Sequence, residues 1–207
     1  MSLTRRALLL ASLALFMLPV PARAADRVIV ALGDSLTAGL GVAAHEAWPA
    51  LLEARLRREG HDYRVVNAGV SGDTSAGGLR RLDWVLRARP AIVIVALGAN
   101  DGLRGLPVDA LRTNLETIVA RLSAAGVRVL LAGMRVPPNY GDAYARDFSA
   151  AFATVARRSG AAFMPFLLDG VAAHAALNQP DGIHPTATGH AMIAERLWPS
   201  LVPLIIR

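Results

Sequence analysis

The chain has 207 residues, of which 54% are hydrophobic and 18% are charged, and it contains no cysteine. This length suits one domain, and the high hydrophobic content excludes a chain that is mainly disordered. The lack of cysteine excludes a disulfide scaffold, a zinc ribbon and a thiol nucleophile. The formal net charge is +6, but the basic residues are all arginines scattered along amphipathic segments, so we expect no nucleic-acid partner.

Residues 1–24 are predicted to be a cleaved signal peptide that directs the protein to the periplasm or out of the cell. Two arginines precede a mostly apolar run at residues 7–20, and Ala22-Arg23-Ala24 supplies an A-x-A cleavage site. A membrane anchor is the alternative, but a spanning helix needs about 20 apolar residues and prolines interrupt this run. The arginine pair also resembles a twin-arginine export signal, which we rank below an ordinary secretory signal. Residues 25–207 are expected to form one domain.

This domain alternates apolar strand patterns with amphipathic helix patterns. In chain order we expect a strand at 27–32, a helix at 48–59, a strand at 63–66, a helix at 79–86, a strand at 91–97, a helix from 107 to 122, a strand at 127–131, a helix around 148–155, a strand at 162–166 and a helix at 186–201. This order predicts an α/β fold with three α/β/α layers and a central, mostly five-stranded parallel sheet.

Glycine and polar residues gather where the first three strands end. The segments are Gly33-Asp34-Ser35-Leu36-Thr37, Ser71-Gly72-Asp73-Thr74 and Gly98-Ala99-Asn100-Asp101, and a later loop reads Asp181-Gly182-Ile183-His184-Pro185. Each segment alone is typical of ordinary turns and helix caps. Because right-handed crossovers bring the carboxyl ends of parallel strands to one edge, we expect the segments to meet there.

The residue types in these segments suit acyl transfer. A serine hydroxyl such as that of Ser35 becomes an effective nucleophile when an adjacent base takes its proton. His184 can be that base, and Asp181, three residues earlier, can hold the imidazole in one tautomer. The backbone N–H groups of Ser35 and Gly72 and the side-chain amide of Asn100 are candidate donors to the oxyanion of a tetrahedral intermediate.

These four segments, in this order, resemble the SGNH (GDSL) hydrolase family over nearly the whole predicted domain. The resemblance implies Ser35 as nucleophile, Gly72 and Asn100 as oxyanion donors, and His184 with Asp181 as base and orienting carboxylate. It also implies a flavodoxin-like α/β/α fold.

Residues 47–52, 100–105 and 135–141 are similar to the bacterial periplasmic branch of that family, which contains thioesterase I, lysophospholipase and arylesterase activities. One departure is Ala99, where many relatives carry glycine. The sequence does not match the Gly-x-Ser-x-Gly elbow of α/β-hydrolases, because Thr37 occupies the position of its second glycine.

Apolar residues in the loops beyond the strand ends are candidates for a substrate groove. They are Leu36, Leu103, Leu106, Val136, Pro137, Pro138 and Tyr140. The alternative is that they cover the core. The resemblance implies that residues 103–106 and 137–140 border an acyl site. We therefore predict a broad hydrolase of carboxylic esters and thioesters, of arylesterase, acyl-CoA thioesterase or lysophospholipase type.

Three other functions stay open. A carbohydrate acetylesterase could use the same machinery, although the 5% aromatic content disfavours a sugar groove. A binding module could use the glycine-rich edge as an anion site, but it would not need Asp181 and His184. An acyltransferase would replace water with an alcohol. We expect no cofactor and no metal, at most peripheral membrane contact, a small-molecule substrate and a monomer.

Several other polar residues are given structural interpretations. Asp73 and Asp101 are expected to stabilise turns, and Asp34 to hold the Ser35 turn or cap the following helix. Arg80 and Arg81 flank an apolar stripe and are expected to form a solvated face. The tryptophans lie on helical stripes and are expected to pack in the core.

Overall fold

A computed structural model describes residues 27–205 of the chain, except for the side chain of Pro138. The predicted signal peptide, residues 1–24, lies outside the described residues. Five parallel strands form one sheet in the order β2-β1-β3-β4-β5, which confirms the predicted fold class. The strands are β1 (Arg27–Gly33), β2 (Tyr63–Gly69), β3 (Ile92–Ala96), β4 (Arg128–Ala132) and β5 (Ala162–Met164).

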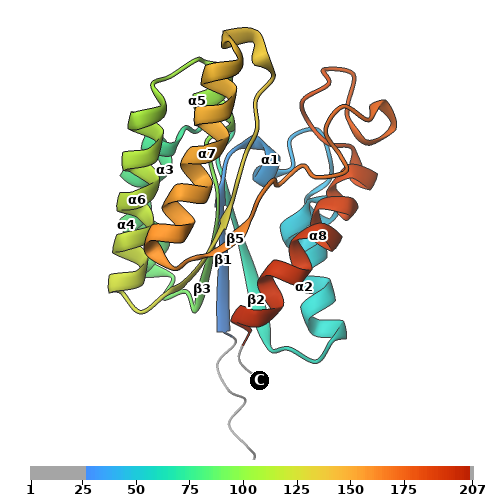
Figure 1. Cartoon of the computed structure of the whole chain (residues 1–207). Helices are drawn as coiled ribbons and strands as arrows, with labels where there is room; N and C mark the ends of the chain where they lie inside the picture. The colour runs from blue at the N-terminus through green and yellow to red at the C-terminus, as the bar shows by residue number, and fades with distance from the viewer. Residues whose placement is uncertain (1–26, 206–207) are drawn as a thin grey trace, which may run out of the picture.

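The sheet lies between two layers of helices (Figure 1). One face is covered by α2 (Trp48–Arg58) and α8 (Ala187–Leu201). The other face is covered by α3 (Ser75–Arg80), α4 (Leu82–Arg87), α6 (Val108–Ala124) and α7 (Asp142–Ser159). The short helices α1 (Ser35–Ala38) and α5 (Ala99–Leu103) follow β1 and β3 directly. Single 3₁₀ turns occur at η1 (Ala44–Glu46), η2 (Pro138–Tyr140), η3 (Ala175–Leu177) and η4 (Val202–Leu204).

Burial explains why these segments adopt these structures. All five residues of β3 are buried, as expected of a central strand that is covered on both faces. Helix α6 buries one continuous stripe at three- and four-residue spacing against the sheet. Two phenylalanines of α7, Phe148 and Phe152, are also fully buried and meet edge to face, with ring centroids 5.4 Å apart.

One predicted helix, at residues 79–86, is wrong as a single element. The backbone leaves the helical conformation at Arg81 (φ −99°, ψ 10°) and forms α3 and α4 instead. Arg81 also does not belong to a solvated face, since its side chain is 19% exposed and bonded to protein oxygens. The packing predicted for Trp84 is wrong too, because its side chain on α4 is exposed.

The strand order places a topological switch point between β1 and β3, because the chain runs to β2 on one side and to β3 on the other. Ligands bind outside the carboxyl ends of strands at such a point. Gly33 pairs in register with Gly69 and with Ala96, so β1, β2 and β3 end at the same level. Between residues 27 and 205, no helix has both the length and the apolar character needed to cross a bilayer.

Candidate active site

Ser35 is presented by a tight turn at the end of β1. It begins α1, and the Oδ1 atom of Asp34 caps this helix by accepting a hydrogen bond of 3.0 Å from the backbone N–H of Leu36. Gly33 cannot be replaced without cost, because a Cβ atom there would overlap the Thr37 side chain. A Cβ atom at Gly69 would overlap the backbone of Ala38 in the same way. The two glycines therefore let α1 lie directly on the strand ends.

His184 lies between Ser35 and Asp181, as the sequence predicted. Its Nε2 atom is 2.9 Å from Ser35 Oγ, and its Nδ1 atom is 2.6 Å from Asp181 Oδ2. The other carboxylate oxygen of Asp181 accepts hydrogen bonds from the backbone N–H groups of His184 (3.0 Å) and Ile183 (2.9 Å). The bonds from the His184 backbone and side chain, followed by that from Ile183, lower the pKa of Asp181 to about 2. The carboxylate therefore stays ionised at neutral pH.

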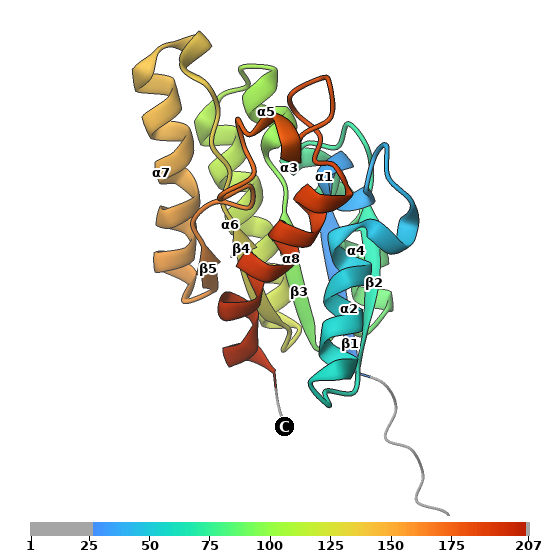
Figure 2. The ribbon, with the colours of Figure 1, turned by 90° about the vertical axis from the view of Figure 1, so that its right-hand side faces the viewer.

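The histidine loop, residues 178–185, is organised by short-range backbone contacts. The N–H of Gln179 donates to the His184 carbonyl (2.7 Å), and that of Gly182 donates to the Gln179 carbonyl (2.9 Å). The Gln179 amide also reaches the carbonyl of Leu40 (2.7 Å), which ties the loop to the segment after α1. Figure 2 shows the long segment between β5 and α8 reaching the carboxyl edge of the sheet beside α1.

Three potential oxyanion donors follow the carboxyl ends of β1, β2 and β3. Gly72 lies in the turn after β2 with a φ of +82°, a conformation that favours glycine. Asn100 lies in the first turn of α5, and its Nδ2 atom donates to the carbonyl of Asp73 (2.9 Å). An amide nitrogen carries two hydrogens, so one remains for a substrate. Across residues 27–205, no acceptor is assigned to the backbone N–H groups of Ser35 and Gly72.

A buried network of hydrogen bonds holds α5 against α3. Asp101 is 3% exposed, and its two oxygens accept hydrogen bonds from the backbone N–H (2.7 Å) and hydroxyl (2.6 Å) of Ser75. The Asn114 amide donates to the same hydroxyl (2.9 Å). Asn100 is thus held on one side by its own bond to Asp73 and on the other by its neighbour Asp101. These contacts agree with the structural interpretation of the two aspartates.

An apolar cavity of about 390 Å³ opens beside Ser35. It lies between Leu36 of α1, Leu103 of α5 and Ile183 of the histidine loop. Val136 and Pro137, both candidates from the sequence, line it as well. Sequence reasoning missed the contribution of the segment after β5, which supplies Phe166, Leu168, Ala172 and Ala173. That segment has no helical or strand periodicity from which its facing side chains could be deduced.

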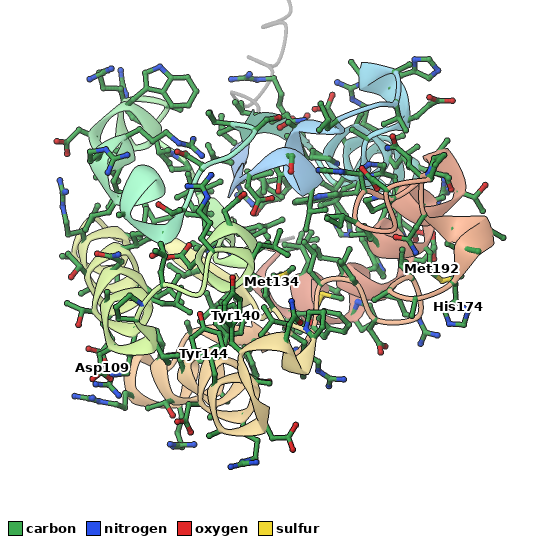
Figure 3. The ribbon with its side chains drawn as sticks, turned by 90° about the horizontal axis from the view of Figure 1, so that it is seen from above. Asp109, Met134, Tyr140, Tyr144, His174 and Met192 are labelled. Atoms are coloured by element: carbon green, nitrogen blue, oxygen red, sulfur yellow. The ribbon has the colours of Figure 1, made fainter. Side chains whose placement is uncertain are left out.

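Leu106 and Tyr140, two further substrate-site candidates, are not among the residues that line this cavity. Leu106 is half-buried, and its carbonyl accepts a hydrogen bond from the Tyr144 hydroxyl (2.8 Å). Tyr140 is exposed and donates to the carbonyl of Leu103 (3.1 Å). The structure does not describe the side chain of Pro138. Seen from above in Figure 3, the cavity residue Met134 lies near the middle of this edge. The rings of Tyr140 and Tyr144 are in contact, with centroids 5.5 Å apart.

Two buried titratable groups lie near the site without belonging to the Ser35–His184–Asp181 chain. Asp34 is 1% exposed, and its Oδ2 atom has no hydrogen-bond partner among residues 27–205. Burial raises the pKa of Asp34 to about 6. His190 of α8 is fully buried and accepts a long hydrogen bond of 3.4 Å from the Trp48 N–H. Burial lowers the pKa of His190 to about 4.

Side chains that could hold a metal do not gather anywhere in the described part of the chain. No three histidine, aspartate or glutamate residues there are arranged as a metal site. His174 and Asp109, two candidate ligand types, lie at the periphery of the edge in Figure 3. The site is therefore built from a serine, an imidazole, a carboxylate and neutral donors, which is a set suited to acyl transfer.

Comparisons with known proteins agree with this geometry. Residues 31–192 match the model of a family described as GDSL-like Lipase/Acylhydrolase. Esterase TesA of Pseudomonas aeruginosa is 46% identical over 202 residues, which cover 97% of this chain and all of that protein. Thioesterase 1/protease 1/lysophospholipase L1 of Escherichia coli K12 is 39% identical over 192 residues, or 92% of this chain and 90% of that protein.

A solved structure gives the same result in three dimensions. The esterase EstA from Pseudoalteromonas sp., inhibited by monoethylphosphonate, superposes with a TM-score of 0.82 at 37% identity. The superposition covers 86% of this chain and 98% of that one.

Proposed function

The chain belongs to the GDSL-like lipase/acylhydrolase family and is a hydrolase of ester bonds, and we propose that it cleaves carboxylic esters and thioesters through an acyl-enzyme on Ser35. The observation that carries the proposal is the hydrogen-bonded chain from Ser35 Oγ through His184 to Asp181, at 2.9 and 2.6 Å. A binding module would have no use for this chain of hydrogen bonds.

In the first half-reaction, His184 Nε2 takes the Ser35 proton while Oγ attacks the carbonyl carbon of the substrate. Asp181 keeps the Nδ1 proton in place and stabilises the imidazolium that forms. The carbonyl oxygen becomes an oxyanion and receives hydrogen bonds from the N–H groups of Ser35 and Gly72 and from Asn100. When the intermediate collapses, His184 returns its proton to the alcohol or thiol that leaves, and the acyl group stays on Ser35.

The second half-reaction repeats the same proton transfers with water. His184 takes a proton from a water molecule as the water oxygen attacks the acyl carbon. The second oxyanion uses the same three donors. Its collapse breaks the bond to Ser35 Oγ, which recovers a proton from His184 and releases the free acid. Every group of the enzyme is then back in its starting state.

We propose the apolar cavity as the site of the acyl group. Its position between Leu36 and Ile183 puts it next to the nucleophile, and apolar linings with few polar groups suit acyl chains. Leu106, Pro138 and Tyr140 stay predictions as contact residues. The printed names of the relatives, esterase and thioesterase/lysophospholipase, support ester, thioester and lysophospholipid substrates.

We further propose that residues 1–24 are removed during export. An exported enzyme rarely meets cytosolic acyl-CoA, so lysophospholipids or other esters are the more suitable natural substrates. Mass spectrometry of the protein recovered from the periplasmic fraction tests the proposal. An N-terminus at residue 25 is expected, and an intact N-terminus in the cytosol would contradict it.

The catalytic proposal is tested by initial rates on p-nitrophenyl esters from acetyl to palmitoyl, with an acyl-CoA thioester as a further substrate. We expect a maximum at medium acyl length, and a loss of at least about 10³-fold in kcat for Ser35→Ala. Ser71→Ala is the matched control, because it removes an exposed hydroxyl from the neighbouring turn. Full activity of Ser35→Ala would refute the nucleophile. A maximum at acetyl alone would instead favour a carbohydrate acetylesterase.

A further inference from the structure

One arginine of the α3–α4 junction is bonded to three segments that converge on the site. The Nη2 atom of Arg81 donates to the carbonyl of Gly33 (2.7 Å), and its Nη1 atom donates to the carbonyl of Ala68 (2.7 Å). Its Nε atom donates to Asp73 Oδ2 (2.6 Å). All three nitrogens of the guanidinium therefore donate to protein oxygens.

Two of the three acceptors lie within two positions of the nucleophile or of a proposed oxyanion donor. Gly33 is the last residue of β1, two positions before Ser35. Asp73 directly follows Gly72, and its carbonyl accepts the hydrogen bond from Asn100. One side chain thus connects the strand of the nucleophile with the turn that contains Gly72 and accepts the hydrogen bond from Asn100.

The surroundings of this arginine leave little freedom. The side chains of Arg81 and Asp73 are only 19% and 15% exposed. A Cβ atom at Gly77 would overlap the Asp73 carboxylate, so the carboxylate is packed against bare backbone. A planar guanidinium with five donors in a fixed fork can hold three oxygens in fixed directions, whereas the single nitrogen of a lysine cannot.

We propose that Arg81 is a positioning residue, which sets Gly72 and Asn100 at the correct distance from Ser35. This inference rests on the proposed function, because it needs an oxyanion hole to position. It adds a residue that lies on a separate helix junction and outside all four sequence motifs. Since Arg81 acts through the donors and not on the substrate, its loss should lower kcat and leave KM unchanged.

The experiment compares kcat, KM and melting temperature for Arg81→Lys and Arg81→Met. Arg81→Lys keeps a positive charge beside Asp73, and we expect kcat to fall about 10-fold or more, because small misplacements of catalytic groups cost up to about 10²-fold. The kcat of Arg81→Met should fall further, to about 10²-fold below that of the parent. Arg80→Met is the matched control, because the neighbouring Arg80 is exposed, and it should keep the parent kcat.

Chemical rescue separates positioning from general stability. In Arg81→Ala, added guanidinium at a concentration far below that which denatures the parent should raise kcat, since the ion can occupy the vacated space. The same salt should not raise kcat of the parent or of Arg80→Met. If Arg81→Ala does not fold, the kcat and melting temperature of Arg81→Lys alone test the proposal.

The outcomes distinguish this inference from the proposed function. Unchanged kcat in Arg81→Lys and Arg81→Met, with Ser35→Ala inactive, overturns the role of Arg81 and leaves the acyl-enzyme proposal intact. Activity in Ser35→Ala overturns both. A loss of kcat only in proportion to a lowered melting temperature, without rescue by guanidinium, assigns Arg81 to stability and also overturns the proposal.

Discussion

The two sides of the site are held in different ways. On the histidine side, Asp181 and His184 lie three residues apart, and the loop is shaped mainly by its own backbone hydrogen bonds. On the oxyanion side, Gly72 and Asn100 are held by Asp73, Arg81, Ser75 and Asp101, which come from several helices and loops. Local geometry of the first kind is encoded in a short motif. Geometry of the second kind depends on the packing of distant elements.

The largest expected loss of kcat concerns the histidine side, which is encoded in a short motif. His184→Ala removes the proposed base, and we expect kcat to fall by about 10³-fold or more. Initial rates on the best p-nitrophenyl ester measure this loss. His174→Ala is a suitable control, because this exposed histidine lies at the periphery of the edge. An unchanged rate in His184→Ala would remove the histidine side from the mechanism.

The second-largest expected loss of kcat concerns the oxyanion side, which is held by packing. Asn100→Ala removes one donor to the oxyanion and should lower kcat by about 10²–10³-fold with little change in KM. Ser75→Ala leaves Asn100 present but breaks the hydrogen bond between the Ser75 hydroxyl and Asp101. We expect a smaller loss of kcat in Ser75→Ala. A rise in KM alone for Asn100→Ala would show that Asn100 binds the ground state instead.

Two carboxylates, Asp181 on the histidine side and Asp34 beside the nucleophile, should give opposite pH dependences of stability. The pKa of Asp181 is lowered to about 2 by hydrogen bonds, chiefly from His184, so its stabilising effect is present above pH 3.8 and is lost as the pH falls towards 2. The pKa of buried Asp34 is raised to about 6, so its contribution to stability changes with pH in the opposite direction. Stability associated with Asp34 is present below pH 3.8 and is lost as the pH rises through 6.

Urea unfolding between pH 2 and 7 separates the two groups. Asp34→Asn keeps a capping side chain and should remove a decline of up to about 3 kcal/mol in the free energy of unfolding between pH 4 and 6. Asp181→Asn should instead flatten the curve below pH 4. If both variants keep the slopes of the parent, these two carboxylates do not set the pH dependence.

The last prediction is that removal of metal ions has no effect on activity. A chelator should leave the rate of ester hydrolysis unchanged, because the proposed steps use only side chains and backbone donors. Dialysis against the chelator, followed by an assay with and without added divalent cations, measures it. A loss of activity that is restored by a cation would contradict the mechanism on both sides of the site.

Much of the fold follows from local sequence patterns. All five predicted strands are present in the sheet. The clearest pattern is that of β3, because a central parallel strand is covered on both faces and must be apolar on both. Three of the four polar segments follow strand ends, and the parallel topology brings such ends to one edge. The contact between Ser35 and His184, 149 residues apart, was predicted instead from chemistry, because a serine nucleophile needs an adjacent base.

Other features depended on contacts that periodicity does not encode. The apolar stripe at residues 79–86 predicts one helix. In the structure, the Arg81 side chain donates to three oxygens of β1, β2 and the turn after β2, and the helix is interrupted at this residue. Phe166 and Leu168 line the cavity from a segment without regular structure, so no spacing rule predicts where they point.

Sequence patterns were sufficient to predict the alternating elements and the parallel sheet, and they predicted that Ser35, His184 and Asp181 act together. These depend on short-range spacing, strand burial and the common edge of a parallel sheet. The contacts of Arg81, the burial of Asp34 and the lining of the apolar cavity became evident only in three dimensions. Each of these depends on which distant side chains pack together, and long-range packing has no fixed period along the chain.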